Sequence, residues 1–322
     1  MKILVTGGAG FIGSHICHRL LDLGHTIICI DNLSSGTVNN IQHLFHHPNF
    51  SFVHTDVLEL TDGSAELNVD AICHQAATGS VPKSIINPEL YHKNNVDMFY
   101  HILELARIKG IKRFIYASSS SVYGDNTSLH KEESNIGNAL SPYAATKQID
   151  ELYARVYAQC YGLETIGLRY FNVFGPRQNP YGDYAAVIPK FIVQLQNNEV
   201  PIINGDGSYS RDFTYVDNAV SANVLALTTS NETCFGQAFN IGAGASTSIN
   251  ELYDSICNLL ESNIHAMHGP TRVGDIPKSL ASIDKAQTCL DYHVLVDITN
   301  GLRNTINFFK ENENINNSTK SK

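Results

Sequence analysis

Three glycines at a fixed spacing follow the first apolar run of the chain. Gly7, Gly10 and Gly13 lie between a strand-like segment and a helical pattern. In such a turn the first glycine adopts the backbone angles that the turn requires, the second lets a pyrophosphate approach the backbone, and the third lets the helix pack closely on the strand. The helix N-terminus presents free N–H groups and a positive dipole end to the phosphates. The spacing therefore predicts a dinucleotide-binding turn that includes Phe11 and Ile12.

An acidic residue, Asp31, follows the next predicted strand. In a dinucleotide-binding fold an acid at this place binds the ribose hydroxyls of the adenosine half, and its charge would repel the 2′-phosphate of NADP. The sequence therefore predicts NAD as the cofactor. We expect further contacts at the ends of the third and fourth strands, although ordinary capping turns are the alternative there. The residues expected at these ends are Asp56, Val57, Gln75, Ala76 and Ala77.

Short β-branched runs alternate with longer helical patterns through the first half of the chain. Because the runs are apolar almost throughout, they predict a parallel sheet covered on both faces, which is a doubly wound α/β fold of the Rossmann type. The predicted strands are Ile3–Thr6, Thr26–Ile30, Phe50–His54, Ala71–Gln75, Phe114–Ala117 and Thr165–Tyr170. The predicted helices are Ile12–Leu23, Val96–Lys109 and Tyr143–Tyr161.

The pattern becomes less regular after Asn172, where glycine and proline interrupt it. We expect residues 1–172 to form the NAD-binding domain and residues 173–311 to form a smaller α/β substrate domain. Segments within 211–242 are expected to return to the first domain, so that the two domains are interleaved. Residues 312–322 are nearly all polar and are expected to form a frayed tail.

Tyr143 and Lys147 lie four residues apart at the start of a predicted helix. This spacing places both side chains on one helical face. A free phenol loses its proton near pH ~10, and a neighbouring ammonium favours the phenolate, which can then act as a general base. A serine run, Ser118–Ser121, follows the strand before this helix. We predict that Ser119, Tyr143 and Lys147 form a catalytic triad and that the latter two also contact the cofactor; a surface tyrosine–lysine pair is the alternative.

Charge and composition limit the class of partner. The chain has 22 Lys and Arg against 31 Asp and Glu, a formal charge of −9, without a basic cluster, so we expect no nucleic-acid partner. No apolar run approaches the ~20 residues that span a bilayer, and the chain opens on its first strand rather than on a signal segment. Seven scattered cysteines without a Cys-x-x-Cys pair indicate a reducing compartment. We expect a cytoplasmic protein without membrane association, and the histidine and cysteine spacings predict no metal site.

With these motifs in place, the sequence resembles the extended short-chain dehydrogenase/reductase family and, within it, the nucleotide-sugar 4-epimerases, most closely those acting on UDP-N-acetylglucosamine. The resemblance covers the chain from Thr6 to about Asp284. Besides the glycine turn and the Ser/Tyr/Lys set, it rests on the segments Asp31–Gly36, Asn94–Val96, Arg169–Gly175, Gly205–Gly207, Arg211–Phe213 and Arg272–Asp275. It implies additional cofactor contacts from Asn32, Ser35, Gly36 and Asn95.

The resemblance also implies a UDP-sugar site and a reaction. Two arginines in that site can grip a diphosphate bidentately despite the negative net charge of the chain. In the implied reaction Tyr143 takes the proton of the sugar 4-hydroxyl while hydride passes from C4 to NAD; the 4-keto sugar turns over, and hydride returns to its other face. The implied UDP-sugar contacts are Asn172, Val187, Lys190, Asn204, Arg211, Arg272 and Asp275.

The resemblance further bears on reaction type and sugar. Similar dehydratases and decarboxylases carry an acid beside the catalytic serine, where this chain has Ser120 and Ser121, so plain epimerisation is implied, with all three serines, Ser119–Ser121, and Tyr143 facing the substrate. Glucose-restricted epimerases tend to carry a tyrosine at Ser279, and the small residue here leaves room for a 2-acetamido group. Gly79 and Ser80 resemble the branch that acts on UDP-N-acetylhexosamines, where Ser80 is implied to contact the acetamido group.

These features together predict a UDP-N-acetylglucosamine 4-epimerase that interconverts UDP-GlcNAc and UDP-GalNAc. The alternatives are a 4-epimerase of UDP-glucose or of a UDP-hexuronate, N-acetylated uronates included, and a non-catalytic NAD-sensing regulator. In similar enzymes the products feed polysaccharide biosynthesis.

Two predicted helices, residues 96–109 and 143–160, carry apolar residues on more than one face, which indicates a second partner surface. In the similar epimerases these helices pair into a four-helix bundle, so the resemblance implies a homodimer; burial within one chain is the alternative. The apolar residues concerned are Met98, Phe99, Ile102, Leu103, Leu105, Leu152, Tyr153, Val156 and Tyr157.

Overall fold

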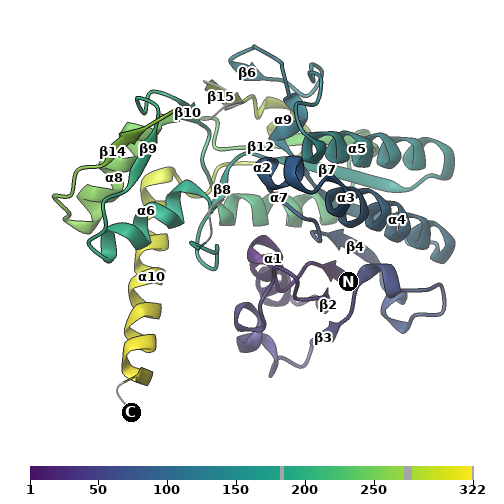
Figure 1. Cartoon of the computed structure of the whole chain (residues 1–322). Coiled ribbons are helices and arrows are strands. Elements are labelled where there is room, and N and C mark those ends of the chain that lie inside the picture. The colour runs from purple at the N-terminus through teal and green to yellow at the C-terminus, as the bar shows by residue number, and fades with distance from the viewer. Residues whose placement is uncertain (182–184, 272–277, 321–322) are drawn as a thin grey trace.

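The computed structural model describes residues 1–181, 185–271 and 278–320. At its centre lies a sheet of seven strands in the order β12-β7-β5-β4-β1-β2-β3 (Figure 1). Every neighbouring pair is parallel, so the predicted parallel sheet is confirmed. The strands are β1 (Lys2–Thr6), β2 (Thr26–Asp31), β3 (Phe50–His54), β4 (Ala71–His74), β5 (Arg113–Ser119), β7 (Glu164–Tyr170) and β12 (Gln237–Ile241).

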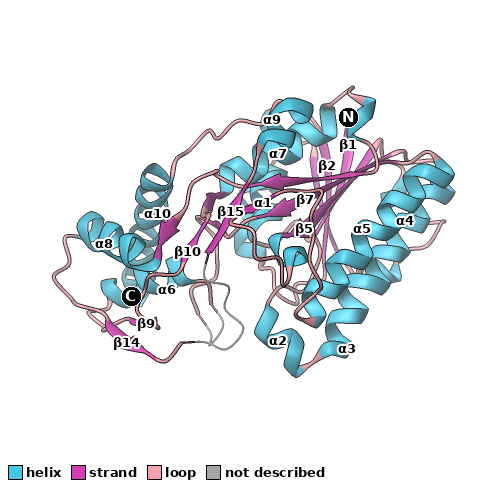
Figure 2. Ribbon diagram, turned by 90° about the horizontal axis from the view of Figure 1, so that it is seen from above, coloured by secondary structure: helices cyan, strands magenta, loops and turns pink. Residues whose placement is uncertain are grey.

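Helices cover both faces of this sheet (Figure 2). On β1, Ile3 and Val5 face one hydrophobic core and Leu4 faces the other, as the two-residue period of a strand requires. The first core is shared with α1 (Phe11–Asp22) and α7 (Val216–Thr228), which pack on each other. The second core is shared with α4 (Met98–Lys109) and α5 (Pro142–Tyr161). This two-sided cover is the doubly wound arrangement that the apolar strands predict.

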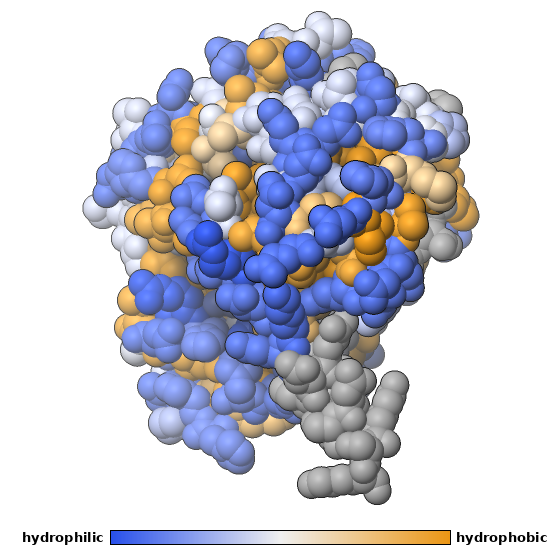
Figure 3. Space-filling model, turned by 90° about the vertical axis from the view of Figure 1, so that its left-hand side faces the viewer, coloured by the Kyte–Doolittle hydropathy of each residue, from blue (hydrophilic) through white to orange (hydrophobic). Residues whose placement is uncertain are grey.

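The remaining elements form a second region beside the sheet. Its helices α6 (Val187–Gln196), α8 (Ile249–Leu260) and α10 (Ile298–Lys320) pack on one another. Short strands complete it in the order β13-β10-β15-β6 and in the pairs β11-β8 and β14-β9. On the face that carries α8 and β14, apolar side chains are interspersed among polar ones (Figure 3). The short strands of this second region are β6 (His130–Lys131), β8 (Val173–Phe174), β9 (Ile202–Asn204), β10 (Ser210–Arg211), β11 (Thr214–Tyr215), β13 (Thr247–Ser248), β14 (Met267–Gly269) and β15 (Lys278–Ala281).

The chain crosses between the two regions more than once. Strand β12 is hydrogen-bonded to β7 at the edge of the seven-stranded sheet. Helix α7 packs against β4, β5 and β7. A further helix, α9 (Asp284–Leu290), contacts both α7 and β12. Residues 216–241 thus lie with the first sheet, although residues on either side of them belong to the second region.

Two short helices, α2 (Val81–Ile86) and α3 (Pro88–Tyr91), are absent from the sequence prediction. Each has a proline in its first turn, where the missing N–H costs nothing. Ser80 and Asn87 cap them by accepting hydrogen bonds from the backbone N–H groups of the first turns. The prolines therefore begin helices here rather than ending them. A π-helical segment, η5 (His92–Asp97), continues into α4.

At the other end of the chain, α10 runs to Lys320. The predicted tail, which starts at residue 312, overlaps the end of this helix. The segment contains no glycine or proline that would end a helix.

Burial also corrects the prediction for the two long helices. The apolar residues that the sequence assigns to a second surface on residues 96–109 are all buried within the chain, and so is Tyr157. Leu152, Tyr153 and Val156 of α5 are exposed as predicted. The buried residues of α4 are Met98, Phe99, Ile102, Leu103 and Leu105. Within the described residues, no helix combines the length and apolarity needed to cross a bilayer.

Candidate active site

The turn between β1 and α1 leaves no space for a side chain at Gly7 or Gly13. Gly7 has a φ of +66°, and a Cβ on it would lie 2.6 Å from the backbone nitrogen of Ala76. A Cβ on Gly13 would collide with the carbonyl oxygen of Gly7. Helix α1 begins after Gly10, which has no side chain to cap it, so the N–H groups of its first turn remain available to a ligand. The turn therefore fits the diphosphate of a dinucleotide.

A cavity of about 450 Å³ extends from this turn to the start of α5. It is lined by 15 of the 17 residues that the sequence assigns to the cofactor. They are Gly7, Gly10, Phe11, Ile12, Gly13, Asp31, Asn32, Ser35, Asp56, Val57, Gln75, Ala76, Ala77, Tyr143 and Lys147.

The other two predicted cofactor residues, Gly36 and Asn95, do not line the cavity. A Cβ on Gly36 would lie 2.9 Å from the carboxylate of Asp31, so the glycine allows the backbone to pass close to that acid. Asn95 is buried, and its Oδ1 accepts a hydrogen bond from the Thr78 backbone N–H at 2.8 Å. Its Nδ2 donates to the Thr146 hydroxyl of α5 at 3.0 Å. The structure thus places Asn95 behind the cavity wall, where it joins a lining loop to α5.

Asp31 lines the cavity at the end of β2. Its carboxylate accepts hydrogen bonds from the backbone N–H groups of Ala9 at 3.0 Å and Leu33 at 2.8 Å. Burial raises the pKa of Asp31, and these N–H groups oppose the rise. At the neighbouring strand end, Asn32 donates to the carboxylate of Asp56 at 2.9 Å. The two acids are thus held in place at the cavity wall, where ribose hydroxyls can donate to Asp31.

Helix α5 brings Tyr143 and Lys147 into the same cavity. Its first turn is fixed by Ser141, whose hydroxyl accepts from the Ala144 backbone N–H at 3.1 Å, and by Pro142. Lys147 is 3% exposed, and its Nζ donates to the carbonyl oxygen of Ala117 at 3.0 Å. An ammonium and a phenol on one helical face, in a cavity with a dinucleotide turn, can bind a hydroxyl group and remove its proton.

The ring of Tyr143 packs edge-on against that of Tyr91, with ring centres 6.1 Å apart. Tyr91 is 1% exposed. This contact comes from α3, a helix that the sequence pattern does not reveal. It restricts the position of the Tyr143 ring in the cavity.

The serine run differs from the expectation in one respect. Ser118 lines the cavity, whereas Ser119, Ser120 and Ser121 are not among its lining residues. The Ser118 hydroxyl is engaged, because it donates to Glu151 at 2.5 Å. Ser119 caps the following turn, its hydroxyl accepting from the Ser121 backbone N–H at 3.2 Å.

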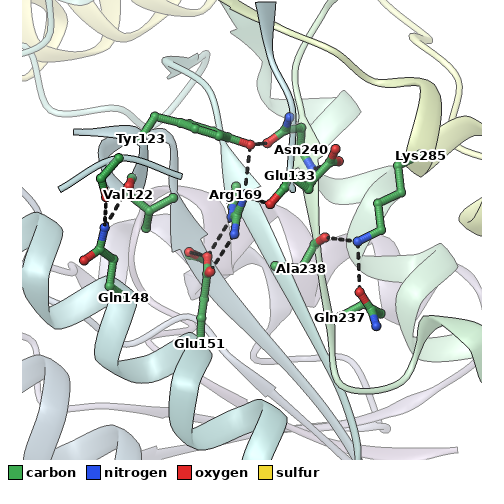
Figure 4. Close-up of polar contacts among 12 residues, drawn as sticks. Val122, Tyr123, Glu133, Gln148, Glu151, Arg169, Gln237, Ala238, Asn240 and Lys285 are labelled. Atoms are coloured by element: carbon green, nitrogen blue, oxygen red, sulfur yellow. Dashed lines mark hydrogen bonds and ion pairs between the residues drawn. The ribbon is translucent and has the colours of Figure 1, made fainter. Parts of the chain in front are cut away.

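A charged network behind the serine run holds it in place (Figure 4). Arg169 of β7 binds Glu151 of α5 through two parallel hydrogen bonds of 2.8 and 2.7 Å. It also donates to the Tyr123 hydroxyl at 3.0 Å, and that hydroxyl donates to Asn240 of β12 at 2.6 Å. Arg169 is 4% exposed, and a buried bidentate pair of this kind is geometrically specific. The network therefore connects β7, α5 and β12 beneath the cavity.

The predicted substrate residues are more dispersed. Gly79 lines the cavity, and Ser80, which follows it, has a φ of 150°, a conformation that non-glycine residues rarely adopt. Ser279 of β15 is the register partner of Arg211 of β10. Asn172 donates to the carbonyl oxygen of Asp212 at 3.0 Å.

The remaining predicted substrate residues lie on other elements of the second region. Val187 and Lys190 lie in the first turn of α6, and Asn204 ends β9. Arg272 and Asp275 lie outside the described residues.

Several lining residues are missed by sequence reasoning, among them Thr78, Tyr170 and Gln178. The Tyr170 hydroxyl donates to Gln75 at 3.0 Å and accepts from Asn223 of α7 at 2.7 Å, so it orients Gln75. These contacts join residues far apart in the chain, so no local sequence pattern predicts them. The other missed lining residues are Ile30, Ser34, Thr55, Asn94, Met98, Ala117 and Ser118.

The sequence and the structure are similar to those of known proteins. Residues 3–242 match the model of the NAD dependent epimerase/dehydratase family. The chain is 38% identical over 314 residues to a putative UDP-glucose 4-epimerase of Methanocaldococcus jannaschii, covering 96% of this chain and 99% of the relative.

Two solved structures are similar over nearly the whole chain. A UDP-N-acetylglucosamine 4-epimerase from Methanobrevibacter ruminantium M1, in complex with UDP-N-acetylmuramic acid, is 39% identical with a TM-score of 0.92, covering 97% of this chain and 98% of that one. A UDP-glucose 4-epimerase from Thermotoga maritima, with UDP-glucose, is 35% identical with a TM-score of 0.91, covering 97% and 100%.

Proposed function

The chain belongs to the NAD dependent epimerase/dehydratase family and is an NAD-dependent UDP-sugar 4-epimerase; from that premise we propose that it interconverts UDP-N-acetylglucosamine and UDP-N-acetylgalactosamine. The observation that carries the reaction is the convergence of Tyr143, Lys147 and the glycine turn on one cavity. The choice of sugar is supported by the small residue at Ser279 and by the similarity to the Methanobrevibacter enzyme.

The residues of the cavity fit NAD. The N–H groups after Gly10 would hold the diphosphate, and Asp31 would accept hydrogen bonds from the adenosine ribose. Lys147, which faces the same cavity, would hold the ribose of the nicotinamide half. When bound, NAD supplies a hydride acceptor and donor beside C4 of the sugar.

The proton chemistry belongs to α5 and the serine run. Tyr143, as the phenolate, takes the proton of the sugar 4-hydroxyl, and it returns a proton to the 4-keto oxygen when the sugar presents its other face. The ammonium of Lys147 stabilises the phenolate from the same helical face. Ser119 would also hydrogen-bond the 4-hydroxyl when the substrate lies between Tyr143 and the turn that Ser119 caps. The protein thereby inverts C4 without net oxidation of the sugar.

The pairing of Arg211 with Ser279 supports the assignment of the sugar. An arginine that binds the diphosphate and a residue beside the sugar ring must lie a few ångströms apart, as neighbouring residues of paired strands do. Serine at 279 leaves space that a tyrosine would fill. Ser80, which follows the lining residue Gly79, accepts a hydrogen bond from the Lys83 backbone N–H at 3.3 Å, and its hydroxyl is the group that we propose to contact the acetamido group.

Turnover of two substrates tests the assignment. Purified protein is incubated with UDP-N-acetylglucosamine and, separately, with UDP-glucose, and the 4-epimers are followed by their anomeric protons in NMR. We expect kcat/KM for the N-acetylated sugar to exceed that for UDP-glucose at least tenfold. A preference for UDP-glucose, or turnover of a UDP-hexuronate alone, would contradict the proposed substrate and leave the epimerase fold and cofactor in place.

We also propose that the protein is a homodimer through α4 and α5. Six large apolar or aromatic side chains on these helices are between 38% and 54% exposed, and exposed apolar surface of this kind marks interaction sites. They are Tyr100, Ile108, Leu152, Tyr153, Val156 and Tyr161. Light scattering at micromolar concentration is expected to give twice the chain mass of 35.4 kDa, and Leu152→Glu is expected to give the monomer. A wild-type monomer would contradict the proposal.

A cytoplasmic location, with a product that serves polysaccharide biosynthesis, completes the proposal. All seven cysteines are free thiols, and four of them, Cys17, Cys29, Cys73 and Cys234, are buried, as suits a reducing compartment. Cell fractionation checks the location, and recovery in a secreted fraction would contradict it.

A further inference from the structure

A buried carboxylate lies directly behind the Tyr143–Lys147 pair. Asp150 follows Lys147 by one turn of α5, and its side chain is 1% exposed. Its Oδ2 accepts a hydrogen bond from Lys147 Nζ at 3.0 Å. Its Oδ1 is buried without a hydrogen-bond partner among the described residues. A carboxylate that lacks a partner on one oxygen is costly to ionise, and burial raises the pKa of Asp150 to about 7, although Lys147 lowers it.

The contacts of Lys147 show what Asp150 does to it. An ammonium has three donors. One N–H donates to the Ala117 carbonyl oxygen and one to Asp150, each at 3.0 Å. Both of these donors therefore bind acceptors of the protein itself. The third is left for the cavity that Lys147 lines. Asp150 therefore fixes the direction in which Lys147 can act.

We propose that Asp150 is a positioning residue that holds Lys147 toward the cavity and whose negative charge opposes formation of the Tyr143 phenolate, so that the charge on Asp150 sets the pH at which the enzyme becomes active. The inference rests on the proposed function for the role of Tyr143. It adds a second charge to the pair: Lys147 favours the phenolate, and the ionised carboxylate seven residues along the same helix counteracts it.

Of the other ionisable groups around this pair, one is ion-paired and the others are kept neutral by burial. On α5, Glu151 is bound bidentately by Arg169 of β7. On β4, burial and then Lys147 lower the pKa of His74 to about 3, which keeps it neutral. On β5, burial holds the pKa of Tyr116 well above its usual value, and Glu151 and Asp150 add to this.

Of the elements packed on the other side of α5, α4 contributes Glu104, which accepts from the Tyr157 hydroxyl at 2.9 Å and pairs with Arg107, and the elements nearer Tyr143 contribute neutral groups. From η5 the facing side chain is the amide of Asn95, which binds Thr146. From α3 it is Tyr91, whose pKa is raised by burial. Asp150 is the buried carboxylate of this set whose pKa burial raises to about 7.

Asp150→Asn is the direct test, because it removes the charge and keeps an acceptor oxygen for Lys147. We expect the midpoint of the acidic limb of log kcat/KM against pH to move down by about one pH unit, as a unit charge two helical turns away changes a protonation equilibrium by roughly this much. Asp150→Glu keeps the charge and is expected to restore the wild-type midpoint. Asp254→Asn, on the exposed face of α8, makes the same change in net charge and is expected to leave the midpoint unmoved.

A second measurement does not depend on turnover. Tyrosinate absorbance is titrated in wild type and in Asp150→Asn, each against the same chain carrying Tyr143→Phe, so that the difference isolates the Tyr143 phenol. We expect its midpoint to lie about one pH unit lower in Asp150→Asn. Asp150→Ser is a second neutral variant should the asparagine chain not fold. A midpoint that is unmoved or raised in the neutral variants would overturn the role of Asp150, and absence of UDP-sugar turnover together with a lowered midpoint would overturn the substrate alone.

Discussion

Arg211 and Ser279 are register partners in the parallel strands β10 and β15. The backbone N–H of the next residue, Asp212, donates to the carbonyl oxygen of Ser279 at 3.1 Å. A side chain at 279 therefore projects from a strand whose position is fixed relative to Arg211. A larger side chain at 279, which is half-buried, is therefore added to the strand that pairs with the strand of Arg211.

Ser279→Tyr is accordingly expected to reduce kcat/KM for UDP-N-acetylglucosamine at least tenfold relative to UDP-glucose, because the ring occupies the volume proposed for the acetamido group. Ser279→Ala, which stays small, should leave the ratio unchanged. Parallel progress curves with the two sugars measure it. An equal loss for both sugars would show that the volume at 279 does not select between them.

Tyr143→Phe is expected to lower kcat at least 10³-fold, since a general base typically contributes 10²–10⁴-fold. The fold and the bound NAD should be retained, because the lost hydroxyl is not part of the glycine turn. Tyr181→Phe, at a side chain that is 74% exposed, is the matched control. Turnover by Tyr143→Phe within a factor of three of wild type would rule out the proposed base.

Gly13→Ala is expected to weaken NAD binding at least tenfold, because the new Cβ meets the Gly7 carbonyl oxygen and pushes α1 away from the turn. Gly63→Ala is its control, since a Cβ there meets only the Thr61 hydroxyl at an ordinary 3.7 Å. Isothermal titration with NAD compares the two. Equal affinities would show that the turn does not carry the diphosphate.

The stability of the protein should fall in mild acid because of His74. Burial and then Lys147 lower its pKa to about 3, whereas the unfolded chain takes up the proton near ~6.5. A depressed pKa contributes stability that is present above the unfolded value and is lost as the pH falls below it. Between pH ~7 and ~5 the loss amounts to about 2 kcal/mol.

His74→Gln, which keeps a polar partner for the Thr6 hydroxyl that His74 binds at 2.7 Å, should lack this part of the pH dependence. Urea unfolding of both proteins at the two pH values measures the difference. Identical pH dependences would mean that His74 is protonated in the folded chain.

The parts of the fold that the sequence predicts well are those with strong local signals. The apolar runs of β1 to β5 and the glycine turn are each specified within a few residues. The proline-led helices α2 and α3 are not, because Pro82 and Pro88 indicate breaks until the caps at Ser80 and Asn87 are known.

The candidate site shows the same division. Tyr143 and Lys147 stand out through their spacing and Asp31 through its place after a strand. The contacts that position them depend on tertiary structure: Tyr91 against Tyr143, and Asp150 against Lys147. From the sequence alone, an aspartate on a helix is expected to face solvent, and only the packing of α5 shows that Asp150 is buried.

The most direct test of the central claim follows the hydrogen on C4. Purified protein, without added NAD, is given UDP-N-acetylglucosamine carrying deuterium at C4, and the product is examined by NMR. Transient oxidation by bound NAD predicts UDP-N-acetylgalactosamine with the deuterium retained at C4, because the same hydride returns to the other face of the sugar. Product that has exchanged its deuterium with solvent, or no product even when NAD is supplied, would contradict the account.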